Sequence, residues 1–470
     1  MSALAIQGTS SWAGKSLLTT ALARSFGRRG IRVAPFKAQN MSNNARVVRG
    51  GEIGVAQYLQ ALAAGVEPDV RMNPVLVKPE ADTRSQVIVE GTVEHELSQL
   101  PWRERAPRLW PVVDRALRSL LADFELVLIE GAGSPAEINL RDSDIANMRV
   151  AAVAEAPVLL VADVDRGGAF AHLYGTWSLV AENDRRRIAG FVLNKFRGDA
   201  TLLRPAPAQL EKLTGVPVLG IVPWLEHGLP DEDGAAAHAP RGRGRPRVAI
   251  VCYPTASNLD EFRALEEVAD VSWVRDASGL TRADLIVLPG SKHVVGDLDW
   301  LARGSIADAI RDRAAAGTRI LGICGGLQLL GNELIDEGGV DGSGAGLRLL
   351  PLVTTFARHK LVRQTKARFV DDLPQPWHDL AGLVAHGYEI RHGATRACGP
   401  VVEALPKGLG YVRDSVLGVY LHGLLEQSTL VEALFGVTLD RTLEAVFDQL
   451  ADVVDEAFDV ERLGALANVR

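Results

Sequence analysis

A glycine-rich loop near the N-terminus has the residue types and spacing to bind a nucleoside triphosphate. The sequence GTSSWAGKS follows a short apolar run and precedes a helical stretch. Backbone N–H groups of such a loop, together with the start of the next helix, bind phosphate oxygens. Five residues separate the two glycines, one more than in the standard motif. A plain strand-to-helix turn is the alternative, and the closing Gly-Lys-Ser favours nucleotide binding. The predicted ATP-binding residues of the loop are Gly8, Thr9, Ser10, Gly14, Lys15 and Ser16.

Phosphoryl transfer also needs a metal and neutralising cations. In this kind of loop Lys15 reaches the β- and γ-phosphates, and the hydroxyl of Ser16 binds Mg²⁺. Glu130 ends a predicted strand, at the edge where parallel sheets place ligands, and we predict that it is a second Mg²⁺ ligand. A solvated carboxylate at the strand end is the alternative. Lys37 ends another predicted strand and could neutralise the phosphoryl group in the ATP site.

A second motif, RILGICGGLQLLG at residues 319–331, places a cysteine where a strand turns sharply into a helix. This is the pattern of a nucleophile elbow, in which small neighbours let the chain turn tightly around the nucleophile. We predict that Cys324 is a nucleophile and that the backbone N–H of Gly325 donates to an oxyanion. A buried structural cysteine is the alternative. Cys252 and Cys398 lack this setting and are interpreted as structural.

A thiolate nucleophile needs a general base, which can lie far away in the sequence. His422 ends a β-type run in GVYLHG, and we predict that it is this base. The turn LPGSK offers further backbone donors, with Gly290 as the predicted second contributor to the oxyanion site. Three other histidines compete for the role of base: His359, His386 and His392.

The elements that position these residues alternate between short β-type runs and longer helical stretches. In the first half we predict strands at 4–7, 32–37, 125–129, 158–164, 188–194 and 216–222. Several of them are continuously apolar, as parallel strands buried on both faces are. The stretch 231–247 is rich in Gly, Pro, Ala and Arg and is predicted to be a linker. A second series follows, with strands at 248–252, 271–274, 285–288, 319–323 and 418–421.

Composition narrows the class of protein. The chain has 470 residues, 47% hydrophobic and 23% charged, which is typical of a globular protein and excludes a mainly disordered or coiled-coil chain. The net charge of −7 argues against a nucleic-acid partner. Three cysteines cannot form a disulfide framework. The apolar stretch 151–164 is too short to span a membrane, and no signal peptide is recognised, so a cytoplasmic location is expected.

A nucleotide loop and a cysteine hydrolase motif in one chain suggest amide synthesis driven by ATP, with ammonia released from glutamine. The chain resembles the cobyric acid synthase family, glutamine-hydrolysing amidotransferases of cobalamin biosynthesis. The resemblance covers nearly the whole chain and runs in the family's order. It rests on GTSSWAGKS, PFKAQNMSNN, GGEIGVAQ, EGAGSPAEINL, VADVDRGGAF, NKFRGD, LPGSK, ICGGLQLLG, GYEIRHG and YLHG.

The resemblance implies two tandem α/β domains. An ATP-binding P-loop amide synthetase domain, similar to dethiobiotin synthetase, is expected at 1–230. A class I (triad-type) glutamine amidotransferase domain is expected at 248–470, after the linker 231–247. The implied reaction is the amidation of carboxylates b, d, e and g of adenosylcobyrinic acid a,c-diamide, which gives adenosylcobyric acid. ATP, Mg²⁺ and L-glutamine are the implied cofactors and ammonia donor; the oligomeric state is not predicted.

The resemblance also assigns residues. It supports Cys324 as nucleophile and His422 as its base, and it places Asn194 and Lys195 near the nucleotide base. Glu52, Asp163 and Asp165 match family motifs without an assigned role.

Two positions depart from related proteins. Many glutamine amidotransferases carry a glutamate two residues after the histidine, where this chain has Leu424, with Glu426 four residues on. The group that orients His422 is therefore not assigned. Arg391 stands where the family often has histidine.

The mechanism that we predict from these features starts with attack of the Cys324 thiolate on the side-chain amide of glutamine. His422 then protonates the departing ammonia and activates water to hydrolyse the thioester. Ammonia crosses between the domains and displaces phosphate from an acyl phosphate made with ATP. The alternatives are a cobyrinic acid a,c-diamide synthase, a non-catalytic ATP-dependent switch with a degenerate hydrolase domain, and a thiol hydrolase with a regulatory nucleotide domain.

Overall fold

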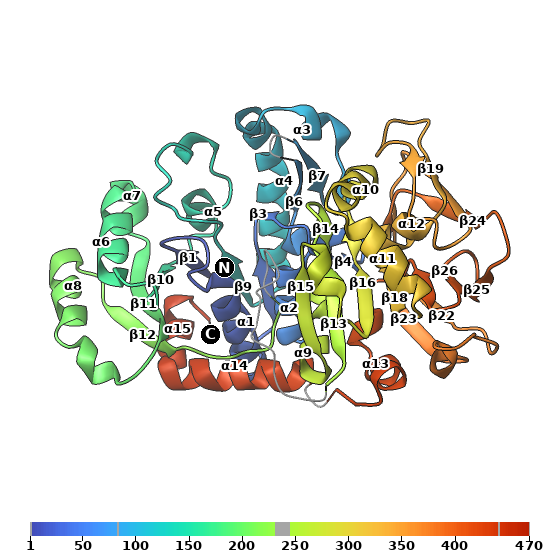
Figure 1. Cartoon of the computed structure of the whole chain (residues 1–470). Helices are drawn as coiled ribbons and strands as arrows, with labels where there is room; N and C mark the ends of the chain where they lie inside the picture. The colour runs from blue at the N-terminus through green and yellow to red at the C-terminus, as the bar shows by residue number, and fades with distance from the viewer. Residues whose placement is uncertain (1, 82–83, 231–244, 440–441, 470) are drawn as a thin grey trace.

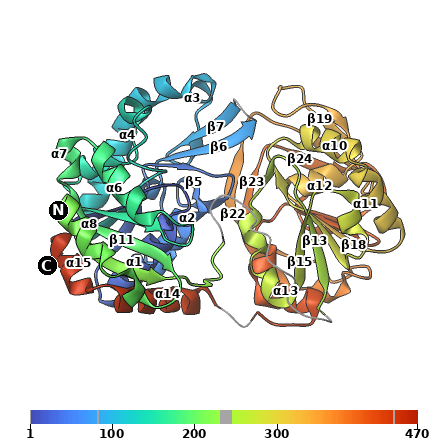
Figure 2. The same cartoon turned by 60° about the vertical axis from the view of Figure 1, so that its left-hand side comes forward.

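The computed structural model describes residues 2–81, 84–230, 245–439 and 442–469. Two α/β lobes lie side by side (Figure 2), and both chain termini lie at the first lobe (Figure 1). Below, the nucleotide half means residues 2–230 and the glutaminase half means residues 245–439. Most of the predicted linker lies outside the described residues, and the first strand of the glutaminase half begins at Arg247.

The nucleotide half is built on a parallel sheet of six strands in the order β12-β11-β10-β1-β9-β2. Parallel strands need helical crossovers, and the helices cover both faces of this sheet. The apolar runs predicted from the sequence are these strands, with ends that differ by a few residues. They are β1 (Ala3–Gly8), β2 (Val33–Phe36), β9 (Leu126–Glu130), β10 (Val158–Asp163), β11 (Ile188–Phe196) and β12 (Val218–Pro223). The longer helices are α1 (Lys15–Arg28), α2 (Val55–Ala63), α4 (Trp102–Asp123), α6 (Ala169–Leu179) and α8 (Ala206–Thr214).

An insertion between β2 and β9 carries six short strands that the sequence analysis did not predict. Four of them form a small mixed sheet and two form a hairpin. These strands are short, and several are apolar on one face only, so they lack the long buried runs that marked the central sheet. They are β3 (Gln39–Met41), β4 (Ala45–Val48), β5 (Gly51–Gly54), β6 (Val75–Ala81), β7 (Arg84–Val89) and β8 (Thr92–Val93).

The glutaminase half is built on a seven-stranded sheet in the order β15-β13-β16-β18-β27-β26-β25, parallel except for its last two pairings. The strand predicted at 418–421 runs from Val416 to Val419. The strands are β13 (Arg247–Val251), β15 (Asp270–Val274), β16 (Leu285–Leu288), β18 (Arg319–Ile323), β25 (Val402–Leu405), β26 (Gly410–Arg413) and β27 (Val416–Val419). The main helices are α10 (Val294–Arg303), α11 (Ile306–Ala315), α12 (Gly325–Leu330) and α13 (Ser428–Phe435).

A long hairpin of the glutaminase half reaches the nucleotide half. Its strands β22 (Leu361–Arg368) and β23 (Val384–Arg391) pair with each other and contact β4. A small apolar cluster spans this contact, formed by Ala45, Val47, Leu76, Ile88, Tyr388 and Ile390. Shorter pieces complete the half: β14 (Ala256–Ser257), β17 (Gly290–Ser291), β19 (Glu333–Ile335), β20 (Gly344–Ala345), β21 (Leu352–Thr355) and β24 (Ala394–Ala397).

The end of the chain returns to the nucleotide half. Helices α14 (Leu443–Ala457) and α15 (Val460–Leu466) share an apolar core with α1 and β12, and α14 lies along α1 (Figure 1). The sequence predicts one domain over 248–470, and the structure differs at the end of that range. The apolar face of α14 packs on the first lobe, so the glutaminase half ends before these helices.

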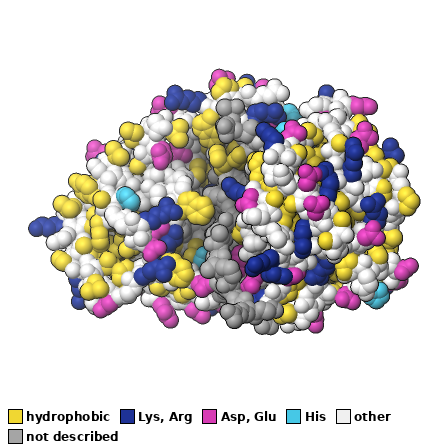
Figure 3. All heavy atoms as spheres, viewed as in Figure 1, with side chains coloured by type: hydrophobic (Ala, Val, Ile, Leu, Met, Phe, Trp, Pro, Cys, Tyr) yellow, Lys and Arg dark blue, Asp and Glu magenta, His cyan; other side chains and the backbone are white. Residues whose placement is uncertain are grey.

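On the face seen in Figure 3, cationic and anionic side chains are interspersed among the described residues. Within the described residues, no helix is both long and apolar enough to cross a membrane.

Candidate active sites

The predicted phosphate loop connects β1 to α1, as its sequence context requires. Gly14 adopts a φ of 91°, and a Cβ there would lie 2.0 Å from Nδ2 of Asn194, so only glycine fits. Gly8 ends β1 close to the amine of Lys15. A Cβ placed at Gly8 would lie 3.0 Å from Lys15 Nζ. The hydroxyl of Thr9 is buried without a hydrogen-bond partner among the described residues. The loop is thus a tight backbone cradle.

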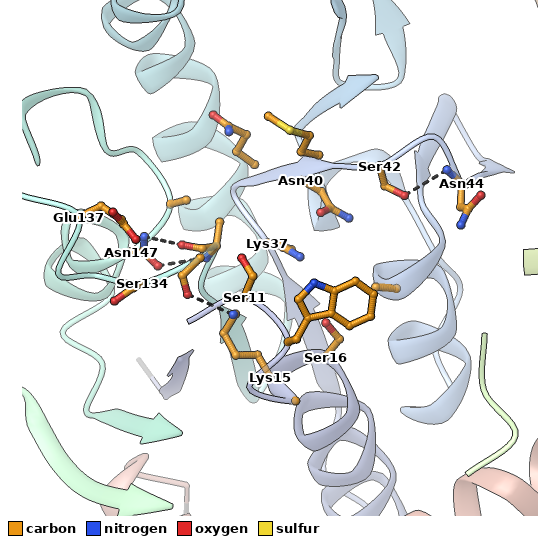
Figure 4. A pocket seen from close by; sticks show the side chains of 18 of the residues that line it. Ser11, Lys15, Ser16, Lys37, Asn40, Ser42, Asn44, Ser134, Glu137 and Asn147 are labelled. Atoms are coloured by element: carbon orange, nitrogen blue, oxygen red, sulfur yellow. Dashed lines mark hydrogen bonds between the residues drawn. The ribbon is translucent and has the colours of Figure 1, made fainter. Parts of the chain in front are cut away.

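Lys15, Ser16 and Lys37 lie together in one pocket at this loop (Figure 4). Lys15 Nζ donates to the carbonyl oxygens of Ser10 at 3.0 Å and Gly133 at 3.1 Å, so the loop is folded around its own lysine. The amine that is predicted to bind phosphate therefore lies inside the loop.

The two predicted metal ligands, far apart in the sequence, meet in space. Ser16 Oγ donates to Glu130 Oε1 at 2.7 Å, and Lys37 Nζ lies 2.9 Å from the same oxygen. Gln60 Nε2 donates to the other oxygen, Glu130 Oε2, at 2.6 Å. Glu130 is completely buried and is stabilised by these donors, because a buried carboxylate needs such partners. Its position excludes the solvated strand-end alternative.

Asn194 and Lys195 contact the phosphate loop itself. Asn194 Nδ2 donates to the carbonyl of Ala13 at 2.8 Å, and Lys195 Nζ donates to the carbonyl of Trp12 at 2.7 Å. Both residues lie at the end of β11 and hold the loop from the side. Lys195 also pairs with Asp163 at 2.9 Å, which gives that family-motif carboxylate a structural partner.

A cavity of about 1640 Å³ opens beside the phosphate loop and is lined by both halves. The nucleotide half contributes Lys15, Lys37 and the segment 39–44, and the glutaminase half contributes residues at the ends of β13 and β15. A substrate much larger than a nucleotide alone fits in this volume, because small-molecule sites commonly measure about 300–1,000 Å³.

Cys324 occupies the predicted elbow between β18 and α12. Its backbone has a φ of 54°, in the left-handed region, which is rare for a non-glycine residue and is the strained geometry of a nucleophile elbow. A Cβ at Gly326 would lie 1.9 Å from the carbonyl oxygen of Leu288. Close packing of the turn against β16 therefore explains why a glycine follows so near to the cysteine.

His422 and Glu261 complete a triad with this cysteine. His422 Nδ1 lies 2.8 Å from Glu261 Oε1, and the N–H of Gly423 donates to Glu261 Oε2 at 2.7 Å. Both side chains are buried. The ring of Tyr388 stacks on the imidazole, with ring centres 5.2 Å apart. The carboxylate fixes the imidazole by binding one ring nitrogen, which leaves the other for the cysteine.

Glu261 is the functional residue that sequence reasoning missed. Many related enzymes carry the orienting glutamate two residues after the histidine, where this chain has Leu424, whereas Glu261 comes 161 positions before His422 in a short helical turn, Leu259–Phe262. Leu424 is buried in the apolar core. The segment NLDEF has no local feature that distinguishes this carboxylate from any other.

Charges around the centre set the protonation of the pair. Burial raises the pKa of the Cys324 thiol, but the nearby cations of His422 and Arg391 outweigh burial and lower it below its ordinary value. Burial lowers the pKa of His422, but Glu261 and Cys324 together raise it to about 10. The surroundings therefore favour the thiolate of Cys324 and the imidazolium of His422 over the neutral pair.

The two predicted oxyanion segments meet at this pair. A Cβ at Gly290 would lie 3.1 Å from Cε1 of His422, and one at Gly325 would lie 2.5 Å from the backbone nitrogen of Ser291. Asp297 stabilises the 290–291 turn by accepting a hydrogen bond from the hydroxyl of Ser291 at 2.6 Å. The two segments thus lie beside each other next to His422.

The competing histidines have other surroundings. His386 and His359 are exposed, and His392 Nδ1 lies 3.2 Å from the carbonyl oxygen of Ala357. Burial, together with nearby lysine charge, lowers the pKa of His392 to about 4. Arg391, at the position where the family often has histidine, lies over the ring of Tyr420 at 4.1 Å.

Glu52, another family-motif carboxylate, is buried between the two halves. It forms ion pairs with Lys78 of the nucleotide half and Lys360 of the glutaminase half. Burial raises its pKa, but these two lysines outweigh burial and keep the pKa far below the ordinary value. Glu52 is therefore an ionic tie between the halves. Asp165 accepts from Arg197 at 2.8 Å on the surface.

Comparisons with known proteins agree with this division of the chain. Residues 4–229 match the model of the CobQ/CobB/MinD/ParA nucleotide binding domain, and residues 247–430 match that of the CobB/CobQ-like glutamine amidotransferase domain. Cobyric acid synthase of Variovorax paradoxus (strain S110) is 54% identical, over 98% of this chain and 98% of the relative. That of Paracidovorax citrulli (strain AAC00-1) is 55% identical, over 97% and 96%.

The chain belongs to the cobyric acid synthase family. It is a glutamine amidotransferase that forms C–N bonds, and the predicted fold of a P-loop domain followed by an amidotransferase domain is confirmed. Membership also supports the use of ATP and glutamine.

Proposed function

We propose that this enzyme amidates carboxylates b, d, e and g of adenosylcobyrinic acid a,c-diamide, with ATP as energy source and glutamine as nitrogen donor, to give adenosylcobyric acid. One observation carries the proposal. A buried Glu261–His422–Cys324 centre and a phosphate loop lie in one molecule, and both halves line the cavity beside that loop. Family membership supports the corrinoid as the acid.

The glutaminase steps follow from the charges at the centre. The Cys324 thiolate attacks the amide carbon of glutamine, and backbone N–H groups at Gly325 and the 290–291 turn stabilise the oxyanion. His422, already protonated, gives its proton to the departing nitrogen, so ammonia leaves uncharged. The neutral imidazole then takes a proton from water, and the hydroxide hydrolyses the thioester to glutamate and restores the thiolate.

In the synthetase step, Lys15 and the loop N–H groups hold the phosphates while an acid carboxylate attacks the terminal one. The donor set fits Mg²⁺, because the hydroxyl of Ser16 and the carboxylate of Glu130 are hard oxygen ligands that already lie in contact. A Mg²⁺ ion bound there would neutralise charge on the phosphates. Lys37 adds positive charge at the same place. Ammonia then attacks the acyl phosphate, and phosphate leaves with the carboxyl oxygen.

We also propose that the enzyme acts in the cytoplasm on small molecules alone, since its substrates are a corrinoid, glutamine and ATP. A cobyrinic acid a,c-diamide synthase has the same two-step logic and remains the alternative. The relatives favour adenosylcobyrinic acid a,c-diamide as the substrate, because proteins named cobyric acid synthase match nearly the full length of this chain.

Mass spectrometry of the corrinoid tests the proposal. Incubation of adenosylcobyrinic acid a,c-diamide with enzyme, ATP and glutamine should give four successive carboxylate-to-amide changes, and the unamidated cobyrinic acid should not be converted at positions a and c. Amidation of cobyrinic acid at a and c would instead favour the alternative. Amidation that proceeds without ATP would contradict the proposal.

A further inference from the structure

Arg46 belongs to the nucleotide half, yet its side chain is buried among residues of the glutaminase centre. It projects from β4 and is 6% exposed. Nη1 donates to Glu426 Oε2 at 2.8 Å and Nη2 donates to Glu426 Oε1 at 2.6 Å, while Nη2 also bonds Asp260. The guanidinium lies 5.3 Å from the centre of the Tyr388 ring. A two-point contact of this kind fixes direction as well as charge.

Each of these three partners adjoins a member of the triad. Asp260 directly precedes Glu261 in the same helical turn, and Glu426 ends the short helix that follows His422. Tyr388 stacks on the imidazole and exchanges backbone hydrogen bonds with His422. One guanidinium therefore clamps the two segments, distant in sequence, that carry the base and its orienting carboxylate.

The clamp is energetically significant because Asp260 is buried. Its other oxygen, Oδ1, has no hydrogen-bond partner among the described residues. Burial raises the pKa of Asp260 to about 6 although Arg46 lowers it. Loss of the guanidinium would leave a buried carboxylate without its cation, which forces local rearrangement or protonation beside Glu261.

The two residues before Arg46 are hydrogen-bonded to the same turn, 258–262. Asn44 Oδ1 accepts from the N–H of Leu259 at 3.0 Å, and the carbonyl of Ala45 accepts from Asn258 Nδ2 at 3.1 Å. Residues 39–44 line the large cavity (Figure 4), and Lys37, two positions before them, pairs with Glu130. The stretch that delivers Arg46 is thus continuous with the nucleotide site.

We infer that Arg46 is a positioning residue for glutamine hydrolysis, through which the nucleotide half holds Glu261 and His422 in reacting geometry. This inference rests on the proposed glutaminase centre. The glutaminase centre is then complete only when the two halves are docked, because Arg46 comes from the nucleotide half, where the ammonia is used.

The test compares two activities of one protein. Arg46→Ala should lower kcat of glutamine hydrolysis by about 10²-fold, the effect of misplacing catalytic groups by about 1 Å. KM for glutamine and corrinoid amidation with added ammonium chloride should stay within about twofold of the parent enzyme, because Arg46 touches neither site. Added guanidinium ion should restore part of the lost hydrolysis. Arg71→Ala is the matched control, since Arg71 also bridges two carboxylates, Asp69 and Asp123, but within the nucleotide half.

The outcomes separate cleanly. Unchanged hydrolysis in Arg46→Ala, or an equal loss in Arg71→Ala, would overturn the inference. If Arg46→Ala loses ammonium-dependent amidation as well, the milder Glu426→Gln decides, and it must lower hydrolysis alone for the inference to stand. Hydrolysis that persists in Cys324→Ser would instead refute the proposed centre itself, whatever the Arg46 variants do.

Discussion

The ionisation of Cys324 is set by two opposing effects at the scale of a single residue. Burial opposes a thiolate, whereas the imidazolium of His422 and the guanidinium of Arg391 favour it, and the cations prevail. His422 in turn keeps its proton because Glu261 and the thiolate stabilise the charge, with a pKa of about 10. The charged form of the pair is therefore favoured by the protein itself.

Alkylation of the cysteines tests this charge state. Because the thiolate is the reactive form, labelling of Cys324 by iodoacetamide should begin at a pH below the ordinary cysteine pKa. His422→Asn removes a cation, so burial then dominates and the onset should move to higher pH. Cys252 is the internal control, because burial raises its pKa to about 11. Peptide mass spectrometry across a pH series measures the labelling of Cys324 in the parent enzyme, of Cys324 in His422→Asn, and of Cys252. Identical profiles for Cys324 and Cys252 would contradict the assignment.

Substitution of Glu261 tests the third member of the triad. Glu261→Gln keeps the shape but removes the charge that orients and stabilises the imidazolium, so glutamine hydrolysis should fall by about 10²-fold. Amidation driven by added ammonium should be retained. Glu266→Gln is the control from the same region, since Glu266 pairs with Arg263 away from the imidazole. Equal hydrolysis in both variants would remove Glu261 from the mechanism.

The sequence predicts those site residues that lie in local motifs and misses those that are defined by contacts between distant segments. Cys324 and the phosphate loop lie in local motifs whose glycines, such as Gly14 and Gly326, reflect close backbone contacts. His422 was predicted because it ends a strand. Glu261 was not, because its role exists only once a turn before β15 packs beside the end of β27, and no nearby residue encodes that contact.

At the scale of elements, the two central sheets position the chemistry and the short strands join them. Parallel strands end at a common edge, so Gly8, Glu130 and Asn194 meet around the phosphate loop. The sequence predicts these strands because both of their faces are buried and apolar. It does not predict β4, β5, β22 and β23, since a short strand with one apolar face resembles a loop until its partner strand is known.

Helix α14 shows a different limit of sequence reasoning. Its spacing of apolar residues indicates an amphipathic helix but not which half of the molecule its apolar face packs against. Phe447 is fully buried against the nucleotide half. We expect Phe447→Ala to lower the free energy of unfolding by about 3–5 kcal/mol. Leu443→Ala, in the same helix but 45% exposed, should change it little. Denaturant unfolding measures both, and a small effect for Phe447 would show that α14 does not stabilise this lobe.

At the scale of the whole molecule, two catalytic sites share one interface. Glu52 ties the halves by its lysine partners, and Arg46 reaches from one half into the other. The large cavity is lined from both sides. We propose that ammonia moves between the sites across this interface as a neutral molecule, without first becoming ammonium in solution. Sequence motifs reveal both sites but not this interface, because its contacts come from distant segments.

Separate inactivation of the two sites tests their division of labour. Lys15→Ala should lower corrinoid amidation by about 10²-fold or more, because a cation that stabilises the phosphoryl transition state is lost. Glutamine hydrolysis should continue in this variant. Lys212→Ala, an exposed lysine on α8, is the control. Assays of released glutamate and of corrinoid products distinguish the two reactions. Loss of both activities in Lys15→Ala, with a folded protein, would contradict the division.

Transfer of nitrogen from glutamine to the corrinoid is the most direct test of the account. The enzyme is given glutamine labelled with ¹⁵N in its side-chain amide, ATP and corrinoid, in a solution that also contains unlabelled ammonium at the same concentration. The account predicts that mass spectrometry finds predominantly ¹⁵N in the new amides, and none in products of Cys324→Ser. Equal incorporation of the two isotopes would show that ammonia equilibrates with solution, and labelled product from Cys324→Ser would show that another group releases it.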